Sequence, residues 1–289
     1  MRLYLIVAAI LLSACNSTNT ELVNREVDSG IVVDTAKTLL VDAEKPVVTK
    51  ISEYNEQLEV IRLNKVLTRA LMVAKQNIAK TRFNEHFTLF PDDSSYQVTA
   101  EIVFGNLFSS DKKHLLIRRV IPWATYINLY YLQKDSLVQV IYREQGGMTY
   151  VKDTILDANG DGQLDYLVHW YPSSGCCRRN IFNVYLYHQE KGTFSSDYEF
   201  VNPTFFSKEK IVRGVMYGHP GEAGLYKYRW SGSLVDTVEL IYHDVSRKGY
   251  YIKTKKTTSR PAAKDGTQLD KLPVEYRAIN DIDWFNLEE

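Results

Sequence analysis

From about Tyr96 to the C-terminus, the sequence is a series of short runs rich in Val, Ile, Leu, Tyr or Phe, separated by turn residues. Each run has the length of one β-strand. The runs cover residues 98–104, 115–120, 126–132, 137–142, 166–170, 182–187, 225–230 and 235–242. No long helical pattern lies between them to serve as a crossover, so neighbouring strands should pair antiparallel through hairpins. We expect a mainly β domain over residues 96–289, as an antiparallel meander that is propeller-like or sandwich-like.

Three of the expected hairpins have similar sequences. They contain residues 127–132, 182–187 and 225–230, each followed by a polar or glycine-containing turn. Their spacing of about 40–55 residues lies in the range in which sheet units of propellers repeat. The alternative is that any antiparallel meander in a chain with 20 Tyr residues shows such a likeness. The sequence leaves both interpretations open.

One helix is expected before the β domain, in the segment 31–95. Its apolar residues recur at steps of three and four, as on one face of an amphipathic helix. They are Ile51, Tyr54, Leu58, Ile61, Leu67, Leu71, Ala74 and Ile78. We expect this apolar face to pack against the core of the protein. Before it, the short runs Ile31-Val32-Val33 and Pro46-Val47-Val48 are rich in β-branched residues and suggest extended chain or an isolated strand.

The first 15 residues have the pattern of an export signal. Arg2 is followed by an apolar run at 3–12, which at about 10 residues is too short for a membrane-spanning helix of about 20. Residues 12–15, Leu-Ser-Ala-Cys, resemble the lipobox of bacterial lipoproteins. That resemblance implies a signal peptide at 1–14, acylation of Cys15 and a lipidated tether at 15–30. The alternative is ordinary secretion with an incidental Cys15.

The residues after Cys15 are small and polar, without an acidic cluster. By resemblance to lipoprotein sorting rules, this favours the outer membrane and its periplasmic face. The protein would then contact the membrane only through its N-terminal lipid.

Residues 157–165, with the sequence DANGDGQLD, have oxygen ligands at alternate positions. Such a spacing lets side chains point inward when the chain curls around a cation, and the glycine after the third ligand allows the sharp turn. The candidate calcium ligands are Asp157, Asn159, Asp161, the main-chain carbonyl of Gln163, and Asp165. The alternative is an ordinary Asp/Asn/Gly turn with no ion.

Two features after this loop define its class. The position of the bidentate Glu in an EF-hand is occupied by Val168, so the loop does not belong to an EF-hand. With the apolar residues 166–168, the run 184–187 and the Gly-Thr-Phe at 192–194, it is similar to the FG-GAP or VCBS-type repeat. That resemblance implies calcium bound between strands of a propeller blade, in proteins that bind partners rather than catalyse.

Cys176 and Cys177 are adjacent in a loop between two expected strands. In an oxidising compartment they can form a vicinal disulfide, link two chains or stay reduced. We expect the vicinal disulfide. Because the cysteine loop follows closely after the acidic loop, we also expect both loops at one end of the sheet.

Charge and motifs limit the function classes. The chain has 35 basic and 35 acidic residues, which gives no electrostatic drive for nucleic-acid binding. The HExxH, GxSxG, GxxxxGK and GxGxxG patterns are absent from the sequence. His169 beside Trp170 is more consistent with a structural role than with catalysis.

These observations favour a non-enzymatic binding module of the cell envelope, with an envelope protein or glycan as its partner. Calcium-loop β lipoproteins also resemble periplasmic lysozyme-inhibitor proteins, which implies inhibition of a cell-wall hydrolase. The alternative is a cell-envelope hydrolase whose active site is assembled from loops.

Overall fold

The computed structural model describes residues 47–90, 96–146, 149–173, 175, 177, 179–258 and 261–287. The compact unit runs from Val47 to Glu289. The expected signal peptide, Cys15, the tether and Cys176 lie outside the described residues, so the expectations about them stay predictions. No helix in the described ranges is both long and apolar enough to span a membrane.

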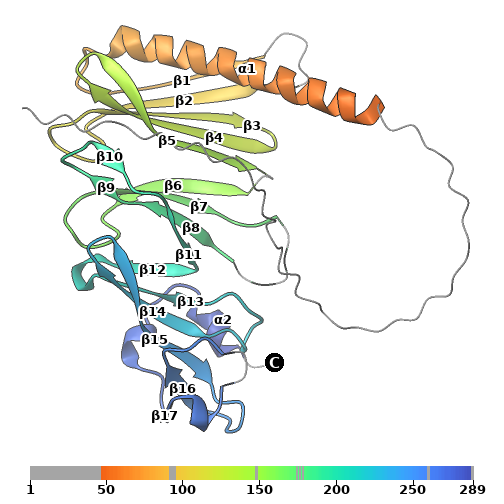
Figure 1. Ribbon diagram of the computed structural model, residues 1–289, viewed down its shortest axis with the longest axis vertical. Coiled ribbons are helices and arrows are strands. Elements are labelled where there is room, and N and C mark those ends of the chain that lie inside the picture. Colours follow the sequence, from red (N-terminus) through yellow and green to blue (C-terminus); the bar gives the residue numbers. More distant parts are fainter. Residues whose placement is uncertain are drawn as a thin grey trace, which may run out of the picture. The chain divides into compact units, whose positions relative to one another are not determined.

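Helix α1 (Val47–Asn77) begins the compact unit and lies against the first sheet (Figure 1). It contains neither Gly nor Pro, the residues that break helices most often. Its most buried residues are Leu63, Val66, Ala70 and Ala74. The expected apolar face was wrong at Ile61, which is 63% exposed. The helix is rotated so that Leu63 and Val66 face the sheet, and Leu67 and Leu71 flank this contact.

The first sheet has five antiparallel strands in chain order. They are β1 (Phe83–Leu89), β2 (Val98–Gly105), β3 (His114–Ile121), β4 (Ala124–Gln133) and β5 (Ser136–Gly146). Successive side chains of a strand point to opposite faces. Leu115 and Ile117 therefore pack toward α1, whereas Leu116 packs on the other side against the second sheet. Burial on both faces explains why three apolar residues, Leu115 to Ile117, follow one another in β3.

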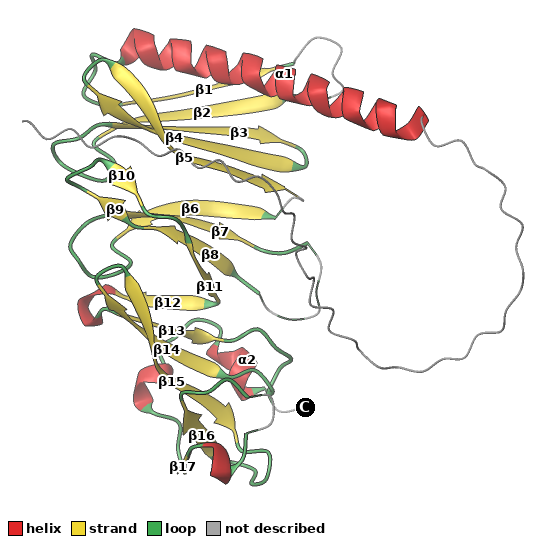
Figure 2. Ribbon diagram, in the orientation of Figure 1, coloured by secondary structure: helices red, strands yellow, loops and turns green. Residues whose placement is uncertain are grey.

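The remaining strands form two further antiparallel sheets and a short hairpin (Figure 2). The second sheet, ordered β11-β8-β7-β6, contains β6 (Tyr150–Leu156), β7 (Asp165–Trp170), β8 (Ile181–Tyr185) and β11 (Tyr198–Val201). The hairpin consists of β9 (Tyr187–His188) and β10 (Thr193–Phe194). The third sheet contains β12 (Pro203–Phe206), β13 (Ile211–Val215), β14 (Leu225–Ser231), β15 (Leu234–His243), β16 (Tyr251–Thr254) and β17 (Thr267–Leu269).

Separate apolar clusters join consecutive layers. Tyr166 and Val168 of the second sheet pack with Leu116 and Leu129 of the first. A second cluster joins the opposite face of the second sheet to the third, and includes Trp230. The sheets are therefore held face to face by side chains from strands that are close in sequence.

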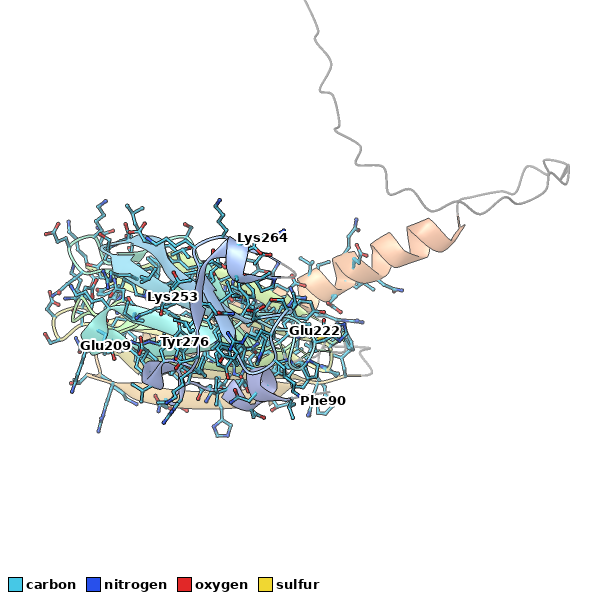
Figure 3. All side chains as sticks on the ribbon, turned by 90° about the horizontal axis from the view of Figure 1, so that it is seen from below. Phe90, Glu209, Glu222, Lys253, Lys264 and Tyr276 are labelled. Atoms are coloured by element: carbon cyan, nitrogen blue, oxygen red, sulfur yellow. The ribbon has the colours of Figure 1, made fainter. Side chains whose placement is uncertain are left out.

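The C-terminal helix α2 (Ile282–Asn286) covers part of the third sheet. Phe285 is fully buried, and the indole of Trp284 donates a hydrogen bond to the carbonyl of Gly218 at 3.0 Å. Nearby, Tyr276 is also fully buried and donates to Glu239 at 3.1 Å (Figure 3). The end of the chain thus docks on the fold as an ordered element.

The structure confirms the expected mainly antiparallel β fold with an N-terminal helix. The described sheets are open, and the choice between a propeller and a sandwich stays a prediction. Seven of the eight expected runs lie within single strands, and the run 182–187 is divided between β8 and β9. The strands that were not expected are β1, β6, β10, β11, β12, β13, β16 and β17. In β1 and β6, polar residues such as Glu85 and Lys152 interrupt the apolar pattern.

His114, at the start of β3, is fully buried among aromatic rings. The ring centroids of Phe108 and Tyr187 lie 5.0 and 5.3 Å from its own. Burial lowers the pKa of His114 to about 4, opposed in part by a backbone hydrogen bond with Lys112. The unfolded chain, with a His pKa near 6.5, therefore takes up this proton at a higher pH than the folded protein does.

Acidification should destabilise the protein through His114. This loss of unfolding free energy is absent above about pH 6.5. It grows as the pH falls toward about 4, where it reaches about 3 kcal/mol. We expect His114→Phe to flatten the dependence of the unfolding free energy on pH across this window, measured by urea titration. His86→Gln, at an exposed position of β1, serves as the control. Equal slopes in the wild type and His114→Phe would refute this assignment.

Candidate functional site

The acidic loop, residues 157–164, connects β6 to β7 in a tight turn. Gly160 and Gly162 have φ values of +74° and +87°, a left-handed region that glycine adopts without steric cost. A side chain at Gly160 would also collide with the main-chain oxygen of Ser207. The two glycines are therefore required by the backbone path of the loop.

The side chains at the first three expected ligand positions accept hydrogen bonds from main-chain amides of the same loop. Asp157 accepts hydrogen bonds from the amides of Gly160 at 2.6 Å and Gly162 at 3.0 Å. Asn159 accepts from the amide of Asp161, and Asp161 accepts from that of Gln163, at 3.0 and 2.8 Å. The side-chain amide of Asn159 also donates to Asp161 at 3.0 Å.

Asp165, the last expected ligand, is fully buried at the start of β7. Its two carboxylate oxygens accept hydrogen bonds from the amides of Ala158 and Tyr187, each at 2.9 Å. Burial raises the pKa of Asp165 to about 7 against the effect of these amides, and the charges of Asp161 and Asp157 raise it further. Among the described residues no cationic side chain pairs with it.

The donor set fits the chemistry of calcium, which takes carboxylate, amide and main-chain oxygens. Asp157, Asn159, Asp161, Asp165 and the carbonyl of Gln163 offer these donors within one turn. Their side chains do not converge on a common point, and the described part of the chain contains no group of three His, Cys, Asp or Glu arranged to hold a metal. Binding would require the Asn159 and Asp161 side chains to rotate away from each other.

The acidic loop also joins the second sheet to the third. Ala158 is fully buried in the cluster shared by these two sheets. The hydroxyl of Ser207, in the turn after β12, donates to the carbonyl of Asp157. On its exposed side, Asp161 and Gln163 border a pocket of about 380 Å³ with the β9–β10 turn. A change in this loop would therefore act on the contact between two layers.

The cysteine loop does not lie beside the acidic loop, which corrects the expectation that both occupy one end of the sheet. The acidic loop precedes β7 at Asp165, whereas the cysteine loop follows β7 after Trp170. A strand of this length spans about 20 Å, so the loops are at opposite ends of it. Cys177 is buried, with its Sγ at 3.8 Å from Nδ1 of His219.

His169 has a structural environment. Its ring stacks on Phe182 with centroids 4.3 Å apart, and its Nε2 lies 3.0 Å from the side-chain oxygen of Asn180. Burial lowers the pKa of His169. These contacts fix the ring between β7 and β8.

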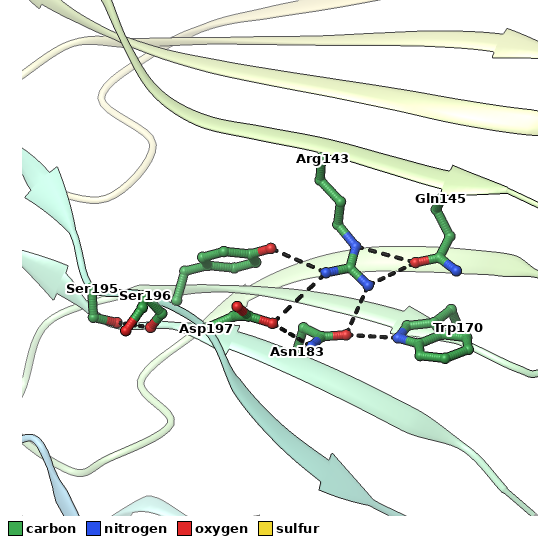
Figure 4. Close-up of polar contacts among 8 residues, drawn as sticks. Arg143, Gln145, Trp170, Asn183, Ser195, Ser196 and Asp197 are labelled. Atoms are coloured by element: carbon green, nitrogen blue, oxygen red, sulfur yellow. Dashed lines mark hydrogen bonds and ion pairs between the residues drawn. The ribbon is translucent and has the colours of Figure 1, made fainter. Parts of the chain in front are cut away.

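The sequence did not reveal a polar network between the first and second sheets (Figure 4). The guanidinium of Arg143 donates to Asn183 at 2.8 Å, to Gln145 at 2.7 Å and to the hydroxyl of Tyr185 at 3.1 Å. Asn183 also accepts from the indole of Trp170 at 2.6 Å. Asn183 is a polar residue inside the apolar run of β8, and this was the only signal in the sequence.

No protein family model matches this chain, and the comparisons with curated proteins and with solved structures find no similar protein. The fold and the candidate site define a layered antiparallel β protein with an acidic loop between its second and third sheets.

Proposed function

We propose that the protein is a calcium-stabilised, lipid-anchored lipoprotein of the cell envelope that acts as a non-enzymatic binding module. The observation that carries the calcium site is Asp165. This buried carboxylate has no cationic partner among the described residues, and two more carboxylates stand within the same turn. A bound cation supplies the missing positive charge, and the resemblance to FG-GAP or VCBS-type loops supports calcium as that cation.

The specific role that we propose is inhibition of a cell-wall hydrolase, as in periplasmic lysozyme-inhibitor proteins. The lipid on Cys15 would hold the module at the periplasmic face of the outer membrane. The test is lysis of a cell-wall suspension by lysozyme, with and without the calcium-loaded mature protein. We expect saturable inhibition. Lysis of the suspension by the protein alone would favour the alternative, a cell-envelope hydrolase.

The lipid anchor gives a separate prediction. Cys15→Ser should abolish incorporation of radiolabelled palmitate, because the acylation chemistry requires the thiol. The variant should also stay unprocessed or be released from the membrane fraction. Cys177→Ser is a control that keeps Cys15. Equal palmitate label in the wild type and Cys15→Ser would remove the lipoprotein proposal.

A further inference from the structure

A groove of about 630 Å³ lies between α1 and the strands β3, β4 and β5 of the first sheet. One wall is formed by α1, which contributes Glu59, and the other by β5, which contributes Tyr142 and Glu144. Arg119 and Tyr126 line the groove between these walls. Its size lies in the range of small-molecule sites, about 300–1,000 Å³. The groove is distant in sequence from the acidic loop.

Arg119 provides a buried positive charge in this groove. The residue is only 3% exposed. Its Nη1 donates to the carbonyl of Leu63 at 2.8 Å and its Nη2 to Asn128 at 3.0 Å, while its Nε has no hydrogen-bond partner among the described residues. Burial lowers the pKa of Arg119, and no described carboxylate forms an ion pair with it. The guanidinium is therefore a buried positive charge at the lining of the groove, and its unpaired Nε is closed off from a ligand.

The carboxylates of Glu59 and Glu144 in the groove have more acceptor sites than the neighbouring donors fill. The hydroxyl of Tyr126 lies 3.3 Å from Glu59 and 3.5 Å from Glu144. A phenol has only one hydrogen to donate, so it cannot serve both carboxylates at once. The indole of Trp123 supplies one further donor to Glu59, at 3.2 Å. The two glutamates therefore present acceptors that the described residues do not fill.

Exposed aromatic rings stand next to these polar groups. Tyr142 is 54% exposed and Trp123 is 42% exposed. Such rings can cover the apolar face of a flat ligand. Of the two rings, Tyr142 lines the groove, whereas Trp123 lies outside its lining, beside Glu59. The groove therefore offers one exposed aromatic ring, acceptors from two glutamates and the side-chain amides of Asn64 and Gln139.

We propose that this groove binds a neutral oligosaccharide. A sugar hydroxyl both donates and accepts, so it can donate to Glu59 or Glu144 and accept from the side-chain amides of Asn64 and Gln139. The face of one sugar ring would pack on Tyr142. The inference rests on the proposed role as a binding module and names the class of ligand.

Charge disfavours other ligands. The groove is lined by Glu56, Glu59 and Glu144, which repel an anion such as a phosphate. A cationic peptide is attracted by these three residues but meets the like charge of Arg119. A neutral ligand rich in hydroxyls avoids both repulsions.

The test is isothermal titration of the full mature protein with chitotriose and maltotriose, and with trilysine as the cationic probe. We expect at least one trisaccharide to bind the wild type saturably. Glu144→Gln and Tyr142→Ala should each weaken this binding about tenfold or more. Both positions are exposed, so these variants should keep the fold. Glu85→Gln and Phe90→Ala, at exposed positions outside the groove, are the matched controls.

Each other outcome overturns the proposal. Absence of saturable binding by both trisaccharides removes it, and so does equal binding by the groove variants and the wild type. Binding of trilysine alone, lost in Glu144→Gln, assigns the groove to a cationic segment instead. A protein that inhibits lysozyme but binds neither trisaccharide keeps the proposed function and loses only this inference.

Discussion

We expect millimolar calcium to raise the melting temperature of the wild-type protein, and Asp161→Ala to remove most of this increase. Extracellular sites bind calcium with dissociation constants of about 10⁻⁴–10⁻³ M. At about 10 mM calcium, which is about 10–100 times these constants, binding stabilises the folded state by about 1.4–2.7 kcal/mol, or about 3–10 °C for a domain of this size. Asp161 is the central carboxylate of the loop and is exposed, so its loss removes a ligand without leaving a buried cavity.

The measurement is differential scanning calorimetry in calcium and in chelator. Asp135→Ala is the matched control, because Asp135 lies in the β4–β5 turn and is also exposed. Asp165→Ala should behave differently from Asp161→Ala. It leaves the buried amides of Ala158 and Tyr187 without acceptors, so it should destabilise the protein in chelator as well. If neither calcium nor chelator changes the melting temperature of the wild type, the proposed calcium site is refuted.

Asp153→Ala should lower the unfolding free energy by about 3–5 kcal/mol, because it leaves Arg118 as a buried charge without its main partner. The two side chains are 8% and 17% exposed, and Nε of Arg118 lies 2.5 Å from Asp153. A second hydrogen bond, from Nη2, measures 2.6 Å. Burial opposes the charged form of Arg118, but these contacts raise its pKa overall.

The control for this prediction is the double variant Arg118→Leu with Asp153→Leu, which removes both charges. Tyr166 donates to Asp153 at 2.6 Å and loses this acceptor in both variants. The difference between them in urea unfolding therefore reports the arginine that has lost Asp153 and keeps only the exposed Glu101, at 3.3 Å, as its partner. We expect the double variant to be clearly more stable than Asp153→Ala. If the two lose equal stability, the buried charge of Arg118 is not the cause.

The strands were predictable where local composition decided their structure. Residues 115–117 are all apolar because this part of β3 is buried on both faces, and this pattern is visible in a short window. β6 was missed because only part of its surface is buried, so polar residues such as Lys152 interrupt the run. The rotation of α1 about its axis could not be predicted from the local sequence either. Several of its faces carry periodic apolar residues, and packing against the sheet selects one of them.

The candidate sites differ in the same way. The acidic loop is continuous in sequence, so its residues could be named from spacing alone. The main-chain amide of Tyr187, which donates to Asp165, lies 22 residues away, so this contact could not be predicted from spacing. The groove between α1 and the first sheet was the least predictable site, because Glu59 and Tyr126, which are in contact there, lie 67 residues apart in the sequence. Only the packing of α1 on the first sheet brings these groups together.

The layered arrangement has a consequence for how the chain can fold if it is exported, as we propose. The first sheet uses only residues up to Gly146, the second only residues up to Val201, and the third begins at Pro203. Each sheet is therefore complete before the strands of the next emerge, if the chain crosses a membrane from its N-terminus. Local pairing of this kind shortens the loops that must close during folding. The apolar face that each finished sheet exposes is then covered by the next sheet to arrive, so folding can proceed layer by layer during translocation.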